Sequence, residues 1–246
     1  MRPASRAFAL VSLSLLCALP AAVTAQEKAE PGEELVKDEA ARKALAGITE
    51  SFQKQPCVRA RIVSEREDLV GKRREEGEMV LQRPDRVLRR FGPPGQAVKA
   101  LRLEGPLLLE YVPREKGVVP RDFGQAPKAL ALARAALTLD TETLAQYFAI
   151  AVFRKPGTEG RPAQWRLVLT RRPEKAELPL APRIQARLEE GAAFFSEIWK
   201  AGEGADDYVV EKYSDLRVEK DLTDRDFDEP LLKKDRREAH VVPEIK

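Results

Sequence analysis

The residues that usually carry covalent chemistry are scarce in this sequence. The chain of 246 residues has one histidine, His240, which stands in a charged C-terminal stretch. A Ser-His-Asp triad needs a histidine base, and the common catalytic zinc sites need histidine ligands. The sequence also lacks a glycine-rich loop with the spacing that cradles phosphate. We therefore predict that the protein is not an enzyme and has no catalytic residues, metal or other cofactor.

Carboxylates offer the remaining route to catalysis. Acidic residues are plentiful, but they fall in turns and on polar faces, as at Asp206 and Asp207. Acidic side chains in such places are ordinarily solvated. A secreted hydrolase that uses two carboxylates is therefore a hypothesis that no constellation of residues supports.

The N-terminal residues have the pattern of a secretory signal peptide. A basic start precedes an apolar run over residues 7–19, and Val23-Thr24-Ala25 supplies the small residues that a signal peptidase reads. The run is shorter than the about 20 apolar residues of a membrane span. We predict a signal peptide over residues 1–25, a periplasmic mature protein and a loose N-terminus over residues 26–34. An uncleaved anchor helix is the alternative.

The cysteines and the charge balance indicate which bonds and partners the mature protein can have. Cys17 lies in the apolar run behind Leu16, where a lipoprotein signal needs a small residue, so Cys57 is left without a disulfide partner. We expect Cys57 to be a small buried apolar residue. Removing Arg2 and Arg6 with the leader leaves 41 basic residues against 40 acidic ones. That balance argues against a nucleic-acid partner, because proteins that bind nucleic acid usually have a net basic face.

Helical periodicity marks two places in the chain. The first is a helix over residues 35–54, which Pro56 ends. Its apolar stripe has helical spacing: Ala41, Leu45, Ile48 and Phe52. The second is an Ala- and Leu-rich insert over residues 125–148, in which Asp140 is predicted to cap a short helix that begins at Thr141.

Period-two alternation fills most of the remaining chain with strands. About six precede the helical insert and about five follow it, and Phe194, Phe195, Ile198 and Trp199 are predicted to form one of the later strands. Consecutive strands joined by short turns favour an antiparallel meander, and a long sheet of this kind curls. We predict an α+β, mainly β fold with about 11 strands, whose concave side is covered by both helical segments. The charged residues 231–246 are expected to form a solvated tail.

Residues 77–122 carry an ordered set of short motifs. They are, in order, Arg83-Pro84, Phe91, Pro93, Glu104-Gly105 and Leu109-Glu110-Tyr111-Val112-Pro113. In order and spacing this set resembles the LolA family, which carries lipoproteins across the periplasm. The segment over residues 222–227 is also similar to the end of that family, and the likeness spans about residues 35–230. The family fold is a curved, incomplete antiparallel β-barrel closed by helices over an apolar cavity, so the resemblance implies a LolA-like domain there.

The resemblance also implies roles for individual residues. Arg83 matches the family's arginine, which hydrogen-bonds to the helical lid and helps it close and reopen; the five donors of a guanidinium can hold several carbonyls at once. A strand-end surface arginine is the alternative. The lid and ligand-binding residues implied are Arg83, Val87, Phe91, Leu107, Leu109 and Tyr111. Two positions depart from the family, because Arg89 replaces a cavity tryptophan and Leu109 replaces an aromatic residue, so we expect a less apolar wall there.

The function that the resemblance implies is carriage without covalent chemistry. A monomeric periplasmic chaperone would shield lipoprotein acyl chains, or another lipid, in the cavity and deliver them towards the outer membrane. Its partners would be an inner-membrane donor protein and an outer-membrane acceptor protein. The alternative is a periplasmic protein of the same fold that senses lipid or regulates an envelope protein.

Overall fold

One sheet of thirteen strands makes up most of the molecule. The computed structural model describes residues 28–68, 71–93, 96–176, 178, 180–202, 207–234 and 239–242; the predicted signal peptide lies outside them. The strands are β1 Glu34–Val36, β2 Cys57–Asp68, β3 Gly71–Gln82, β4 Arg86–Phe91, β5 Lys99–Glu104, β6 Leu107–Val112, β7 Gly117–Asp122, β8 Phe148–Lys155, β9 Gln164–Arg171, β10 Arg183–Glu189, β11 Glu197–Ala201, β12 Tyr208–Val218 and β13 His240–Val241.

The sheet joins two meanders side by side. Its strand order is β1-β8-β9-β10-β11-β12-β2-β3-β4-β5-β6-β7-β13. The first meander, β2 to β7, meets the second, β8 to β12, where β12 pairs with β2. Neighbours pair antiparallel, apart from the short β13, which runs parallel to β7. Because β1 and β13 stand at opposite ends of this order, the sheet stays open, as an incomplete barrel requires.

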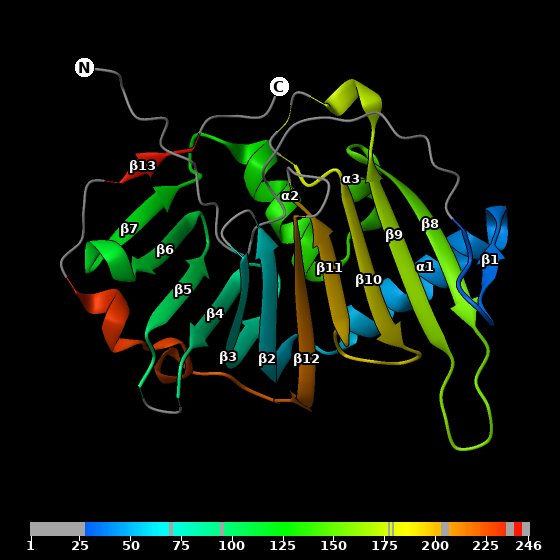
Figure 1. Ribbon diagram of the computed structural model, residues 1–246, viewed down its shortest axis with the longest axis horizontal. Coiled ribbons are helices and arrows are strands. Elements are labelled where there is room, and N and C mark those ends of the chain that lie inside the picture. The colour runs from blue at the N-terminus through cyan, green and yellow to red at the C-terminus, as the bar shows by residue number, and fades with distance from the viewer. Residues whose placement is uncertain are drawn as a thin grey trace.

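Three helices cover one face of the sheet, which we call the helix face. They are α1 Asp38–Lys54, α2 Pro127–Thr138 and α3 Thr141–Ala145, and Figure 1 shows them behind the twisted sheet. Ile48 and Phe52 of α1 are buried in the main core, with the two helices of the insert packed into the same cluster. Asp140 caps α3 by accepting hydrogen bonds from the backbone N–H groups of Glu142 and Thr143. The predicted antiparallel sheet with both helical segments on one side is confirmed.

A second, smaller core lies on the opposite face, which we call the outer face. Val80, Leu88 and Leu109 point there and are covered by Phe227 and Leu232. The covering residues belong to short 3₁₀ helices, η3 Asp224–Phe227 and η4 Pro230–Lys233; two others, η1 Pro113–Glu115 and η2 Pro173–Lys175, lie in connections. The expected solvated tail over residues 231–246 therefore needs correction, since it buries Leu232 and supplies β13.

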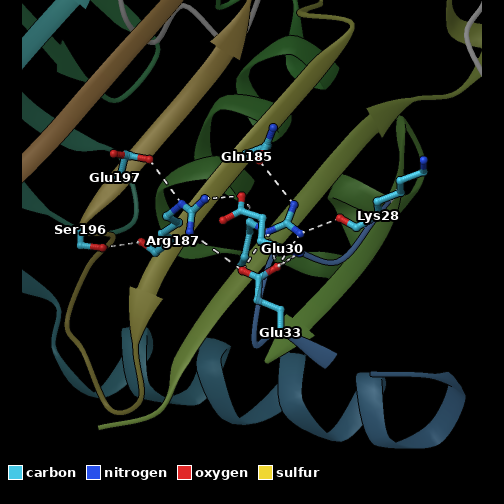
Figure 2. Close-up of polar contacts among 8 residues, drawn as sticks. Lys28, Glu30, Glu33, Gln185, Arg187, Ser196 and Glu197 are labelled. Atoms are coloured by element: carbon cyan, nitrogen blue, oxygen red, sulfur yellow. Dashed lines mark hydrogen bonds and ion pairs between the residues drawn. The ribbon is translucent and has the colours of Figure 1, made fainter. Parts of the chain in front are cut away.

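Residues 28–34, the described part of the segment that we expected to be loose, are held by charged contacts. The carboxylate of Glu33 is 6% exposed and accepts a hydrogen bond from Nη2 of Arg166 at 2.6 Å. Arg187 contacts Glu30 at 2.5 Å and Glu197 at 3.4 Å. Figure 2 shows Glu30, Glu33, Arg187 and Glu197 gathered over β10 and its neighbours. The segment is thus fastened across the outer face by charge.

Several element boundaries differ from the predicted ones. Residues 34–36 form the edge strand β1, so α1 starts later than the helix predicted from residue 35. The helical insert ends before Phe148, where β8 begins, and no strand was predicted there specifically. Phe194 and Phe195 lie in the β10–β11 connection, because β11 begins at Glu197. The edge strands β1 and β13 account for the difference between thirteen strands and the predicted number of about 11.

Candidate functional site

A small, mainly apolar cavity lies between the helices and the sheet. Its volume is about 80 Å³. Strands β3, β4 and β9 to β12 form its wall, and α2, α3 and the β10–β11 connection cover it. The apolar lining includes Met79, Val87, Leu137, Leu144, Ile184 and Phe194. Pockets for small ligands usually measure roughly 300–1,000 Å³, so this cavity is smaller than a typical ligand pocket.

Arg83 fastens the covering elements to one another. It directly follows β3, and its Nε donates to the Leu137 carbonyl of α2 at 2.9 Å. Its Nη2 donates to the Ala193 carbonyl at 2.8 Å, and its Nη1 donates to the carbonyl of Gln55 at the end of α1. The Leu137 carbonyl belongs to the last turn of α2, where helical carbonyls lack intrahelical partners. One guanidinium therefore joins α1, α2 and the β10–β11 connection.

Arg83 forms no ion pair with a carboxylate in the described part of the chain. Its guanidinium carbon lies 4.7 Å from the centroid of the Phe52 ring and 5.9 Å from that of the Phe194 ring. Burial lowers the pKa of Arg83 to about 10, so the side chain is still a cation at neutral pH. Carbonyl dipoles and ring faces balance the charge, and opening would return it to water.

Two further contacts tie down the C-terminal half of α2. The hydroxyl of Thr49 in α1 donates to the Leu139 carbonyl at 2.9 Å. Arg134 of α2 pairs with Asp85, in the turn between β3 and β4, at 2.5 Å. We call α2 and α3 together the lid. These two contacts attach α2 to the β3–β4 turn and to α1.

A charged cluster is buried at the sheet side of the cavity. Glu211 of β12 is at its centre, 1% exposed. It accepts hydrogen bonds from Arg89 at 2.6 Å, from the Lys200 ammonium at 3.1 Å and from the Tyr213 hydroxyl at 2.9 Å. All four residues line the cavity. One carboxylate therefore stands between two cations in an otherwise apolar space.

The pKa values in this cluster follow from burial and from the excess of cations. Burial alone would raise the pKa of Glu211, but the charges of Arg89 and Lys200 outweigh it and hold the pKa far below its usual range. Burial lowers the pKa of Lys200, and Arg89 lowers it further while Glu211 opposes the change. Burial and the charge of Glu211 raise the pKa of Tyr213 well above 10, so its hydroxyl stays a donor.

The structure divides the residues that the resemblance implied between two faces. Val87 lines the cavity, and Phe91 is buried in the same core on the helix face. Leu107, Leu109 and Tyr111 pack instead in the outer-face core, under the C-terminal segment. They do not meet the cavity, which corrects their assignment as ligand-binding residues. Strand β6 is apolar on both faces, so alternation within its sequence did not identify the face that points inward.

The sequence had given only part of the charged cluster. Arg89 was expected to make the wall less apolar, and it does line the cavity. Lys200, Glu211 and Tyr213 were not selected. A signal did exist, because period-two alternation places Lys200 on the same face as Ile198 and places Glu211 on the same face as Tyr213. The pairing of β11 with β12 was needed to bring the two strands together.

Comparisons with known proteins give fold-level likenesses. No protein-family model matches the sequence, and no curated protein matches it either. A LolA superfamily protein from Nitrosomonas europaea matches with a TM-score of 0.39 and 10% identity, over 77% of this chain and 97% of that one. A DUF1329 family protein from Desulfovibrio piger matches with a TM-score of 0.44 and 12% identity, over 78% and 98% of the two chains.

A third solved structure is a Vibrio parahaemolyticus domain described as an outer membrane lipoprotein-sorting protein. It matches with a TM-score of 0.40 and 13% identity, over 79% of this chain and 100% of that one. Members of the LolA superfamily and lipoprotein-sorting domains are thus among the structural matches, at low sequence identity. These likenesses concern the fold, so the chemistry of the cavity has to be argued from its own residues.

The described residues contain no group of three or more histidine, cysteine, aspartate or glutamate side chains placed to hold a metal ion. None of the helices in the same part of the chain combines the length and apolar character of a membrane span.

Proposed function

We propose that the protein is a periplasmic carrier that shelters lipoprotein acyl chains in the cavity under the lid and delivers them towards the outer membrane. It would receive cargo from an inner-membrane protein and pass it to an outer-membrane acceptor. The observation that carries the proposal is the contact set of Arg83. A single side chain binds three backbone carbonyls from three separate elements around an apolar cavity, which is the arrangement of a releasable latch.

The energies suit a reversible carrier. Each methylene buried on binding contributes about 0.8 kcal/mol, whereas a hydrogen bond from a charged group contributes roughly 1.5–3 kcal/mol. Several methylenes of one chain therefore suffice to offset the latch and hold the lid open. When an acceptor withdraws the chain, the carbonyls of Gln55, Leu137 and Ala193 are again available to Arg83, and closure opposes rebinding.

Arg83→Leu tests the latch directly. The variant loses the three donors but keeps an apolar side chain against Phe52. We expect it to fold, to populate the open form more and to bind a neutral apolar fluorophore about tenfold more tightly, because apparent affinity scales with the population of the competent state. We also expect slower transfer of a bound lipoprotein to acceptor, since closure no longer favours release. Arg83→Lys should restore part of the wild-type behaviour, because an ammonium lacks the planar fork.

Arg86→Leu is the matched control. Arg86 lies three residues along the chain, but its guanidinium covers Phe227 at 4.1 Å on the outer face. Its loss should leave probe affinity and transfer unchanged. If Arg83→Leu folds and then binds and releases probe like the wild type, the latch does not exist. If probe binds but no lipoprotein is ever transferred, the alternative of a lipid-sensing or regulatory protein replaces the carrier.

A further inference from the structure

The charged cluster in the cavity has more positive than negative charge. Arg89, Lys200 and Glu211 are the charged residues among the described cavity-lining residues, so the wall has one cation in excess. Glu75 also acts on Arg89, but it is itself paired with Lys99 at 2.8 Å. That neighbouring pair is neutral and leaves the excess in place.

Lys200 uses one of its hydrogen-bond donors within the described part of the chain. Its side chain is 7% exposed and lines the cavity. An ammonium has three N–H donors, and Glu211 is the one hydrogen-bond acceptor that Lys200 has in the described part of the chain. A buried cation is costly unless it is paired and hydrogen-bonded. Two of its donors therefore have no acceptor in the described part of the chain.

We propose that Lys200, supported by Arg89 and Tyr213, binds the anionic head group of a free single-chain amphiphile whose hydrocarbon chain fills the apolar part of the cavity. The head would be a carboxylate or a phosphate monoester, both of which offer negatively charged oxygens to an ammonium. Glu211 has the role of a positioning residue, because it holds Arg89 and Lys200 together on the cavity wall.

The apolar part of the site lies directly beside this head-group position. Ile198 and Ile184 flank Lys200 on the same face of β11 and β10, and Phe194 packs against Tyr213 with ring centroids 5.0 Å apart. A chain that leads away from the ammonium therefore meets aliphatic and aromatic side chains under the lid. Acyl chains of lipoproteins are held in ester or amide links and have no charge at that end, so they would leave the excess cation unmatched.

This inference rests on the proposed function in one respect, because both need the lid to open and admit a hydrocarbon chain. It extends the ligands from lipoprotein chains to free acidic amphiphiles. The two ideas make different predictions about the head group: the carrier proposal needs only a chain, whereas the Lys200 site needs an acid.

The carrier proposal and the Lys200 site are distinguished by displacing a neutral apolar fluorophore from the full mature protein at pH 7. The competitors are hexadecanoate, hexadecyl phosphate and hexadecanol, which share one chain and differ in the head. We expect either acid to displace the probe at a concentration about tenfold or more below that of the alcohol, as a charged hydrogen bond implies. The acid that binds more tightly identifies the head group.

Lys200→Met should remove this preference and keep binding of hexadecanol. The variant is expected to fold, because it leaves Arg89 and Glu211 as a balanced pair at 2.6 Å. Lys212→Met, which removes an exposed lysine paired loosely with Glu65 at 3.7 Å, is the control and should keep the preference. Lys200→Arg retains the charge and should keep most of it, so the test stands even if the methionine variant is unstable.

The outcomes distinguish failure of the site from failure of the carrier. Equal binding of acid and alcohol by the wild type would overturn the head-group site and leave the acyl-chain cavity intact. The same conclusion follows if Lys200→Met keeps the preference for acid. If no competitor binds the wild type and the fluorophore does not bind either, the cavity is not a hydrocarbon site and the proposed function falls as well.

Discussion

Arg89 and Arg166 are buried on opposite faces of the sheet, and their surroundings differ in the source of negative charge. Arg89 on the helix face is 3% exposed and Arg166 on the outer face is 2% exposed. Arg166 is matched by Glu33 and lies over the Phe153 ring at 4.1 Å. Arg89 shares Glu211 with a second cation, Lys200. The two arginines are therefore about equally buried, but the charges around them are balanced differently.

The difference separates a structural cluster from a candidate ligand site. On the outer face the chain brings its own carboxylates, because the N-terminal segment lays Glu30 and Glu33 over Arg166 and Arg187 (Figure 2). Among the described residues, no comparable acidic segment reaches Lys200 in the cavity. The outer-face cluster is neutralised by the protein's own carboxylates and holds the N-terminal segment on the sheet. The cavity cluster has one more cation than carboxylate beside an apolar space, which suits an acidic ligand.

Replacing Glu211 is expected to have the largest effect on the stability of the folded protein. Glu211→Gln removes the carboxylate that Arg89 and Lys200 share, and breaking a buried ion pair in this way costs about 3–5 kcal/mol. Urea unfolding at pH 7, followed by circular dichroism, measures the change. The triple variant Glu211→Leu, Arg89→Leu and Lys200→Met should recover much of the loss, because well-packed apolar residues often replace buried ion pairs without penalty. A Glu211→Gln protein as stable as the wild type would contradict the charge excess.

The contrast between the two clusters also shows what the sequence could predict. Alternation and turn residues gave the antiparallel meanders, and helical spacing gave the stripe that ends at Phe52, because these are local properties of the chain. The lid contact of Arg83 came from the family resemblance, and the structure places its guanidinium on the carbonyl of Leu137. Its role in opening and closing stays a prediction.

Long-range pairing was the part that the sequence did not supply. Glu33 meets Arg166 across 133 positions of the chain, and Arg89 meets Glu211 across 122. In a sequence with 34% charged residues, local patterns do not tell which acid meets which base. The same limit explains the misassigned face of Leu109, since the segment that covers it, around Phe227, returns from the far end of the chain.

A smaller effect is expected on the outer face. Glu33→Gln removes one charge, but Arg166 keeps Glu30 at 3.7 Å, the Lys28 carbonyl at 3.1 Å and the Phe153 ring. We therefore expect a loss of about 2 kcal/mol, within the range for a charged hydrogen bond. Limited proteolysis should cut the N-terminal segment faster, while displacement of the apolar probe stays at the wild-type level. A change in probe binding would show that the two clusters are coupled and would break the comparison.

The smallest expected effect is the pH dependence of the stability that each of the two clusters contributes, and it is the finest test of the comparison. The pKa of both carboxylates is lowered in the folded protein. Burial would raise the pKa of Glu33, but the hydrogen bond and charge of Arg166 outweigh it. Burial would likewise raise the pKa of Glu211, but Arg89 and Lys200 outweigh it, and the shift at Glu211 is the larger one.

A group whose pKa is lowered in the folded state stabilises the protein at pH values above its unfolded pKa, which is near 4.3 for glutamate. That contribution is lost as the pH falls towards the folded pKa. The stability difference between wild type and each Glu→Gln variant should therefore be constant from pH 7 to about pH 5. Below about pH 4 both differences should shrink, by at most about 1.4 kcal/mol per pH unit. The difference for Glu33 should level off first, whereas the difference for Glu211 should continue to fall at lower pH, because Glu211 accepts hydrogen bonds from both of its cations, Arg89 and Lys200. Urea unfolding of the three proteins between pH 7 and pH 2.5 measures both curves, and other acids such as Asp226 cancel because they are common to all three. If the two curves level off at the same pH, the carboxylates have equivalent surroundings and the excess of cations around Glu211 is not present in solution.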